Sequence, residues 1–388
     1  MKRLLFFIFI LTALAWPSST ANAAADPIPV AAQAADYFGP PLCRPGMVED
    51  GTCLFAGPAQ TVAQMREEGF PYPPRDLPAA APAADLVEIP VFIAKINLAD
   101  YEPAPLYGSF EDAVAGVNPV GQIAPGTLRY VSYINRQDYN GNPYLQLASG
   151  SWLRASPAAY TDFQGLVFFD NPRNNFGWIF DTTESYSSPS FGAPLTGEQY
   201  YSEDIVQAYN QIDVEGTTWY QIGREEWVYE QKVRIVSPQY TPPEGVAGNR
   251  WIEVDLSKQT LTVYEDGQLR FATMVATGQD PFYTKPGIFQ IDEKKPLETM
   301  QGAFEPDRSD FYYLEDVPWT MYYDQARALH AAYWRIMFGY PQSHGCVNLS
   351  PGDANWLFDW ADEGDFVWVH DPSGQTPTDP DYYGPGAP

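Results

Sequence analysis

The chain has 388 residues, of which 45% are hydrophobic and 15% aromatic, so it can bury more than one core. Its formal net charge of −27 argues against a nucleic-acid partner, because binding to phosphates needs clustered Lys and Arg. The 37 prolines and 26 tyrosines favour strands and turns over helices, and indicate a mainly β protein.

Residues 1–23 have the features of a signal peptide. Lys2 and Arg3 precede an apolar run from Leu4 to Trp16, which is too short to span a bilayer comfortably. An Ala-Asn-Ala cleavage site follows at 21–23. We expect an exported protein, secreted or associated with the cell wall, without a membrane span after cleavage; the alternative is an uncleaved anchor.

Residues 24–89 are rich in Ala and Pro and are interpreted as a linker. The linker contains Cys43 and Cys53, which predict a small-loop disulfide in an oxidising compartment, although two unpaired thiols are the alternative. Cys346, the third cysteine, is then left over. An unpaired cysteine in an exported protein either forms an intermolecular disulfide or is a free, reactive thiol.

The region 90–238 alternates short apolar runs with turn signals, which is an all-β pattern. It also contains an internal repeat, because six positions are each followed 75 residues later by a similar residue. The pairs are Gly141 and Gly216, Tyr144 and Trp219, Gln146 and Gln221, Leu147 and Ile222, Trp152 and Trp227, and Leu153 and Val228. We infer two β modules, 90–165 and 166–238; chance similarity of aromatic strands is the alternative.

A Pro/Gly-rich linker at 239–249 leads into a third, β-rich domain at 250–370. Its opening segments 251–256 and 260–265 alternate as strands do. One short helix is predicted late in this domain, with Ser350 as N-cap, Pro351 in the first turn and Gly364 at its end. Residues 371–388 are rich in Pro, Gly and Asp and are predicted to be disordered.

Cys346 lies in a Ser-His-Gly-Cys segment that can hold a nucleophile. A thiol becomes a good nucleophile when an imidazole takes its proton, and Gly345 permits a tight turn whose amides face a developing oxyanion. His344 is two residues away, whereas His330 lies far enough upstream for the chain to fold back. Spacing alone does not choose between these two histidines. A zinc site with the same residues would lack a fourth ligand.

The segment 329–358 resembles the active-site signature of the L,D-transpeptidase catalytic domain, in which an upstream His precedes Ser-His-Gly-Cys, an apolar residue, and Arg or Asn. The matching residues are His330, Ser343, His344, Gly345, Cys346, Val347 and Asn348. Segments 250–278 and 284–291 also resemble the family. The departures are Ala331-Ala332, where a Gly-Thr pair is usual, and Lys285, where Pro is usual. The modules at 90–238 resemble the small bacterial Src-homology-3-like barrels found beside cell-wall enzymes.

The resemblance implies a role for each matched position. His330 would be the base that activates Cys346, oriented by the Ala331 carbonyl, while the His344 side chain and the Gly345 and Cys346 amides would stabilise the tetrahedral intermediate. Ser343 and Asn348 would hold the loop or the substrate. Tyr333 and Trp334 would lie beside the site as substrate contacts, with core packing as the alternative.

The function that the resemblance implies is peptidoglycan cross-linking. A tetrapeptide stem would acylate the cysteine as a thioester, and an amine of a neighbouring stem would resolve it; water as acceptor would make the protein an L,D-carboxypeptidase. No metal or cofactor is implied, and the β modules would contact glycan or the wall. The alternatives are a non-catalytic wall-binding or scaffolding protein, and a transpeptidase that links a protein to peptidoglycan.

Overall fold

The computed structural model describes residue 65 and residues 75–383, except 305, 306 and 309. The chain divides into two units, Met1–Ala63 and Gln64–Pro388, and all described residues belong to the second. The predicted signal peptide and the pair Cys43 and Cys53 lie outside the described residues. Within those residues, no helix is both long and apolar enough to cross a membrane.

The fold is mainly β, as predicted. The strands up to residue 157 are β1 (Ala79–Ala80), β2 (Phe92–Lys95), β3 (Ala104–Tyr107), β4 (Pro119–Ile123), β5 (Leu128–Tyr133), β6 (Asn135–Tyr139), β7 (Asn142–Gln146), β8 (Trp152–Arg154) and β9 (Ser156–Pro157). Those up to residue 236 are β10 (Leu166–Phe168), β11 (Asn175–Ile179), β12 (Thr183–Tyr186), β13 (Leu195–Tyr200), β14 (Ile205–Ala208), β15 (Asn210–Val214), β16 (Thr217–Gly223), β17 (Glu226–Tyr229) and β18 (Val233–Val236).

The predicted repeat is present in the backbone. In the β6–β7 hairpin Asn135 is opposite Gln146, and in the β15–β16 hairpin Asn210 is opposite Gln221, so the registers differ by the offset of 75. The strand orders also correspond: β5-β2-β9 matches β14-β11-β18, and β4-β3-β8-β7-β6 matches β13-β12-β17-β16-β15. The ends of the two modules stay predictions.

One helix, α2 (Phe110–Ala115), was not predicted from the sequence. It connects β3 and β4, begins at the N-cap Ser109, whose side chain accepts a hydrogen bond from the Asp112 amide, and ends at the left-handed Gly116. Six residues are too few to produce a recognisable helical period, which explains the omission.

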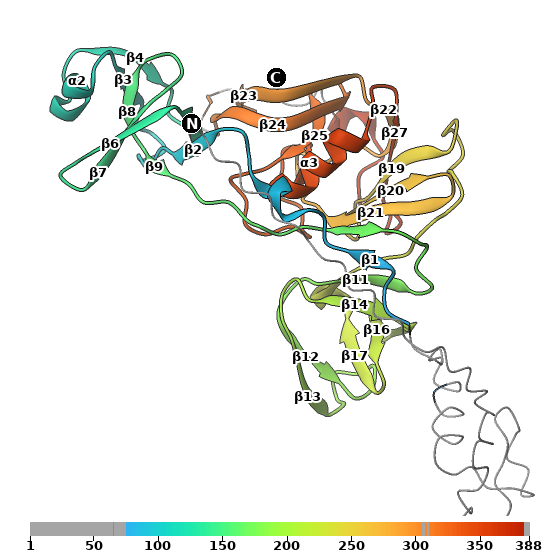
Figure 1. The fold of residues 1–388 in the computed structure, drawn as a ribbon. Coiled ribbons are helices and arrows are strands. Elements are labelled where there is room, and N and C mark those ends of the chain that lie inside the picture. Colours follow the sequence, from blue (N-terminus) through green and yellow to red (C-terminus); the bar gives the residue numbers. More distant parts are fainter. Residues whose placement is uncertain (1–64, 66–74, 305–306, 309, 384–388) are drawn as a thin grey trace, which may run out of the picture. The chain divides into compact units, whose positions relative to one another are not determined.

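The third domain is built from two sheets and one helix. Its strands are β19 (Arg250–Asp255), β20 (Thr260–Glu265), β21 (Gln268–Met274), β22 (Gly287–Gln290), β23 (Glu293–Gly302), β24 (Tyr312–Asp324), β25 (Arg327–Ala331), β26 (Val347–Leu349) and β27 (Phe366–His370). One sheet has the order β1-β10-β21-β20-β19-β27-β22, and the other runs β26-β25-β24-β5-β2-β9. The helix α3 (Pro351–Trp360) lies against β24 and β25 (Figure 1).

The start of α3 agrees with the sequence analysis. The Ser350 side chain accepts a hydrogen bond from the Asp353 amide, and Pro351 occupies the first turn. The buried Asp353 carboxylate also accepts hydrogen bonds from the Gly165 amide and the Thr273 hydroxyl. The predicted end at Gly364 is wrong, because the helix stops at Trp360 and the next residue is extended.

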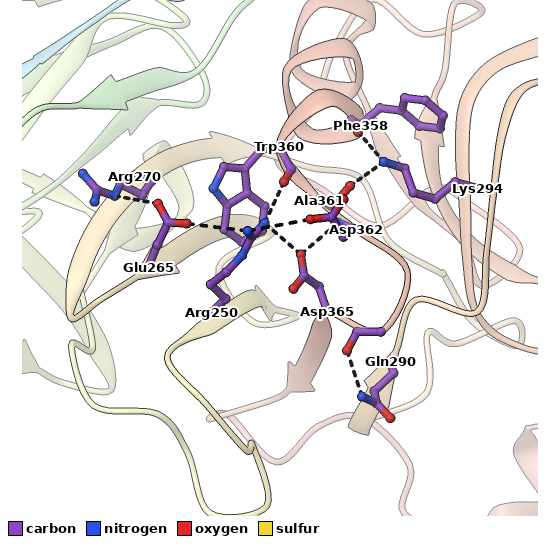
Figure 2. A network of polar contacts seen from close by, with 11 residues as sticks. Arg250, Glu265, Arg270, Gln290, Lys294, Phe358, Trp360, Ala361, Asp362 and Asp365 are labelled. Atoms are coloured by element: carbon purple, nitrogen blue, oxygen red, sulfur yellow. Dashed lines mark hydrogen bonds and ion pairs between the residues drawn. The ribbon is translucent and has the colours of Figure 1, made fainter.

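Two cations from the sheets stabilise the C-terminal end of α3 (Figure 2). Lys294 donates to the carbonyls of Phe358, at 2.6 Å, and Ala361. Arg250 donates to the Trp360 carbonyl at 2.7 Å and its guanidinium lies 4.3 Å from the centre of that indole ring. Because the last carbonyls of a helix carry partial negative charge, these contacts fix the helix on both sheets without a cation in its own last turn.

Segments outside 250–370 complete both sheets of the third domain. β10 pairs with β21, β1 pairs with β10, and β5 pairs in parallel with β24, where Leu128 is opposite Tyr312. A 3-10 helix, η1 (Ala84–Val87), contacts α3. The predicted linker at 24–89 therefore has regular structure near its end, because it covers strand edges and a helix face.

The segment after β27 also differs from the predicted disorder. The Asp371 carboxylate accepts hydrogen bonds from Ser373 and Thr376, and a 3-10 helix, η3 (Pro380–Tyr382), follows. The Tyr383 ring lies 5.8 Å from the Arg327 guanidinium. The Tyr382 ring also lies edge-on to that of Tyr283, with centroids 6.3 Å apart. The part of the tail that the structure describes is therefore held by local polar contacts and by two aromatic contacts with the third domain.

Gly126→Ala tests the packing of β5 against β24. A Cβ at Gly126 would lie 2.2 Å from the Phe311 carbonyl oxygen, which accepts the Thr127 amide at 3.0 Å. We expect a loss of about 1–3 kcal/mol in the free energy of unfolding, measured by chemical denaturation. Gly121→Ala is the control, because its Cβ would lie 3.8 Å from the nearest atom. Equal stability of the two variants would contradict this packing.

Candidate active site

Two adjacent parallel strands bring the predicted site residues together. β25 pairs with β26 so that His330 is opposite Asn348, and Cys346 immediately precedes β26. Side chains alternate along a strand, so residues 346 and 348 share one face, and His330 lies on the same face beside them. By this register Cys346 and His330 are diagonal neighbours, which spacing alone did not establish.

Cys346 carries a free, partly buried thiol. Its Sγ donates to the Ala326 carbonyl at 3.7 Å and accepts a backbone hydrogen bond from Ala328. Burial raises the pKa of the Cys346 thiol, and the Ala328 hydrogen bond and the Arg327 charge oppose this effect only in part. The thiol is therefore protonated at neutral pH.

His330 is buried and neutral. Its Nδ1 lies 3.0 Å from the Ala331 carbonyl oxygen, which can only accept, so Nδ1 carries the proton and Nε2 carries the lone pair. Burial lowers the pKa of His330 to about 4; the Ala331 carbonyl raises it, and the Arg335 charge lowers it further. Among the described residues, no hydrogen bond joins His330 to the Cys346 thiol.

The Asn348 amide occupies the Nε2 side of His330 instead. One terminal atom of this amide lies 3.1 Å from His330 Nε2, and the other lies 2.6 Å from Arg335 Nε. A guanidinium can only donate, so the amide oxygen faces Arg335 and the NH₂ group donates to Nε2. Arg335 was missed by the sequence analysis, although it is the one cationic residue between His330 and Ser343.

Hydrogen bonds within and around the loop fix the turn at residues 343–346. Ser343 Oγ donates to the Cys346 carbonyl at 2.6 Å and accepts from the Gly345 amide at 3.2 Å. Gly345 has a φ of 115°, which side chains disfavour. Thr284 Oγ1 donates to the Gly345 carbonyl at 2.9 Å and accepts from the Gly278 amide at 2.8 Å. Ser343 therefore holds the loop, and Thr284 is an unpredicted partner.

Aromatic rings surround His344. Its ring stacks on Phe304 with centroids 4.5 Å apart, and lies 4.8 Å from Phe282 and 6.2 Å from Tyr312. Burial lowers the pKa of His344, which Asp310 opposes. Phe304 lies in the connection from β23 to β24, so this hairpin reaches the site. The rings come from segments far apart in sequence, and no local pattern indicated them.

Tyr333 and Trp334 have different surroundings. Tyr333 is 1% exposed, and its hydroxyl donates to the Glu315 carbonyl at 2.7 Å, which fits the packing alternative. Trp334 is partly buried, with its ring 5.7 Å from that of His330. Only Trp334 of this pair therefore contacts a predicted catalytic side chain.

A cavity of about 880 Å³ does not include Cys346 or His330 in its lining. Its lining includes Gly278 and Thr284, which are hydrogen-bonded to each other and, through Thr284, to Gly345. It also includes Phe180 and Arg234 from the second β module. Within the described residues, no group of three or more His, Cys, Asp or Glu side chains could hold a metal ion.

Comparisons with known proteins find sequence similarity in the third domain. Residues 249–369 match the family profile of the L,D-transpeptidase catalytic domain. L,D-transpeptidase 1 of Mycobacterium tuberculosis is 31% identical over 171 residues, which cover 38% of this chain and 66% of the relative, slightly less than two thirds. L,D-transpeptidase 2 of the same species is 29% identical over 127 residues, or 31% of each chain.

Among solved structures, the catalytic domain of the Enterococcus faecium L,D-transpeptidase is 28% identical, over 32% of this chain and 100% of that one, with a TM-score of 0.29. The family assignment depends on the sequence matches rather than on this superposition. Residues 249–369 are therefore assigned as an L,D-transpeptidase catalytic domain.

Proposed function

We propose that the chain is an exported L,D-transpeptidase that cross-links peptidoglycan through a thioester on Cys346. The observation that carries the proposal is the position of the Cys346 thiol and the neutral His330 imidazole on one face of adjacent strands, in a domain that matches this family. A protonated thiol beside a neutral imidazole can become a nucleophile by transferring one proton.

The proposed reaction has two halves. The sulfur attacks the carbonyl between an L-centre and the terminal D-residue of a tetrapeptide stem, while the thiol proton moves to His330 Nε2. The carbon–nitrogen bond then breaks, and the D-residue leaves as an amine with that proton. An amine of a second stem attacks the thioester, forms a new amide and returns the proton to sulfur.

Proton transfer requires a change of partner at His330 Nε2. In the structure the Asn348 NH₂ group donates to this atom, so it must move aside when the thiol proton arrives. Hydrogen bonds in unliganded active sites commonly tighten only with substrate bound, so the resting contact is compatible with a role as base.

The oxyanion would be stabilised by donors around the loop. The Gly345 amide is engaged with Ser343 Oγ in this conformation, so we propose the Cys346 amide and the His344 ring as the principal donors. Stacking on Phe304 holds the His344 ring in place.

Water in place of the acceptor amine would make the protein an L,D-carboxypeptidase, and a protein amine would make it an enzyme that links protein to the wall. We propose that the two β modules contact glycan or the wall. A scaffolding protein without activity is the alternative of a different class. Analysis of the products from paired stems separates these outcomes.

Cys346→Ala tests the nucleophile. We expect the wild-type chain to gain the mass of one acyl group when incubated with a carbapenem or a tetrapeptide stem, and Cys346→Ala to gain none, measured by intact-protein mass spectrometry. Circular dichroism checks that both are folded. An adduct on Cys346→Ala would refute the assignment, and a folded wild type without an adduct would favour the scaffolding alternative.

The three histidines can be compared directly. We expect His330→Gln to slow acylation by about 10²- to 10⁴-fold, the usual contribution of a general base, and His344→Phe, which keeps the stacked ring, to slow it less. His370→Gln is the control, because His370 contacts Glu253 at the end of β27. Rates come from stopped-flow acylation. An acylation rate in His330→Gln equal to that of the wild type would refute the assignment of His330 as the base.

A further inference from the structure

Arg335 is a partly buried cation whose hydrogen bonds lead through Asn348 to His330. Its guanidinium donates to the Asn348 amide oxygen through Nε at 2.6 Å and Nη2 at 3.3 Å. It also donates to the side chain and the carbonyl of Gln342. Burial lowers the pKa of Arg335 only to about 10, so it is charged at neutral pH. A partly buried charge is costly unless its hydrogen bonds are well satisfied.

The guanidinium fixes which end of the Asn348 side chain faces His330. An Asn amide can present either its oxygen or its NH₂ group, and the two orientations differ little in shape. With Arg335 in place, the oxygen is drawn to the guanidinium and the NH₂ group is left for His330 Nε2. Rotation by 180° would place two donor groups against each other and leave the oxygen facing Nε2.

The amide orientation in turn selects the protonation state of His330. An NH₂ group is a donor, so it stabilises a lone pair on Nε2 and opposes a proton there. The Ala331 carbonyl holds the proton on Nδ1 at the other side of the ring. The imidazole is thus fixed as one neutral tautomer, with its basic atom on the face shared with Cys346.

We propose that Arg335 is a positioning residue that sets the neutral Nδ1-protonated tautomer of His330 by orienting the Asn348 amide. The inference rests on the proposed role of His330 as base, since the tautomer matters only if Nε2 receives the thiol proton. Arg335 itself touches neither the thiol nor the imidazole in the contacts that the structure gives. Its influence passes through Asn348 and through its charge, which also opposes a second proton on the ring.

The two influences can be separated by substitution. Arg335→Met removes both the charge and the guanidinium donors, whereas Arg335→Lys keeps the charge but loses the planar pair of donors. Asn348→Asp keeps an acceptor for Arg335 and removes the donor to Nε2. It places a carboxylate against the imidazole, which favours a doubly protonated ring.

Nitrogen-15 labelling of histidine provides a direct readout, because the chain has three histidines. In the wild type we expect His330 to show a protonated Nδ1 and an unprotonated Nε2 at pH 7, without titration above about pH 5. In Arg335→Met and Asn348→Asp, the midpoint should rise by at least about one pH unit, a tenfold change in the protonation constant. The His330 midpoint in Arg335→Lys should lie between the midpoints of these two variants and that of the wild type.

Arg234→Met is the matched control. Arg234 is another partly buried guanidinium with a pKa that burial lowers to about 10, and it contacts Gly339 and Phe180 rather than Asn348. It should leave the His330 titration unchanged. If Arg335→Met does not fold, as judged by near-ultraviolet circular dichroism, the outcome for Arg335→Lys decides, because this variant keeps the charge and loses only the planar pair of donors to Asn348. A wild-type tautomer and midpoint in the folded variants would overturn the proposal.

The readout does not depend on transpeptidation. If His330 shifts as expected in the variants while the wild type forms no acyl adduct, the positioning role holds and the proposed function fails. If the adduct forms and His330 does not shift, the proposed function stands and Arg335 acts only in packing.

Discussion

The parallel pairing of β25 with β26 determines the geometry of the site. This pairing places His330 opposite Asn348 and puts Cys346 one step before the strand, so the three side chains of the candidate site share a face without a long loop to position them. The paired segments lie in the main hydrophobic core, where Leu329 and Val347 are fully buried. Burial therefore specifies the register of this strand pair, because a slip of one residue would move every side chain of the strand to the opposite face of the sheet.

The neighbouring strands β24 and β5 extend the sheet that contains β25 and β26. β24 lies next to β25 and is flanked by β5, which belongs to the first module in sequence. The Ser132 amide on β5 donates to Glu315 on β24 at 3.1 Å. β24 also continues into the hairpin that carries Phe304 onto His344. Strands from the predicted linker, from the β modules and from the third domain thus pair within the same sheets.

Local sequence patterns predicted the parts of the site that lie within one segment. The Ser-His-Gly-Cys turn, the upstream His330 and the capped start of α3 each depend on residues a few positions apart. Other contacts join segments that are distant in sequence, and their residues have no distinctive local pattern. These contacts are the stacking of Phe304 on His344, the hydrogen bond from Thr284 to Gly345, and the pairing of β5 with β24. Arg335 lies inside the motif, but its role appears only once Asn348 is placed beside it.

The environment of the site favours uncharged partners. Burial raises the pKa of the Cys346 thiol and lowers that of His330, so the pair consists of a thiol and an imidazole rather than a thiolate and an imidazolium. Ultraviolet absorbance of the thiolate tests this claim most directly, as the difference between wild type and Cys346→Ser across a pH titration. The account predicts no thiolate absorbance from Cys346 at pH 7, and its appearance only above the ordinary thiol range. A full thiolate signal at pH 6 to 7 that is lost in Cys346→Ser would contradict it.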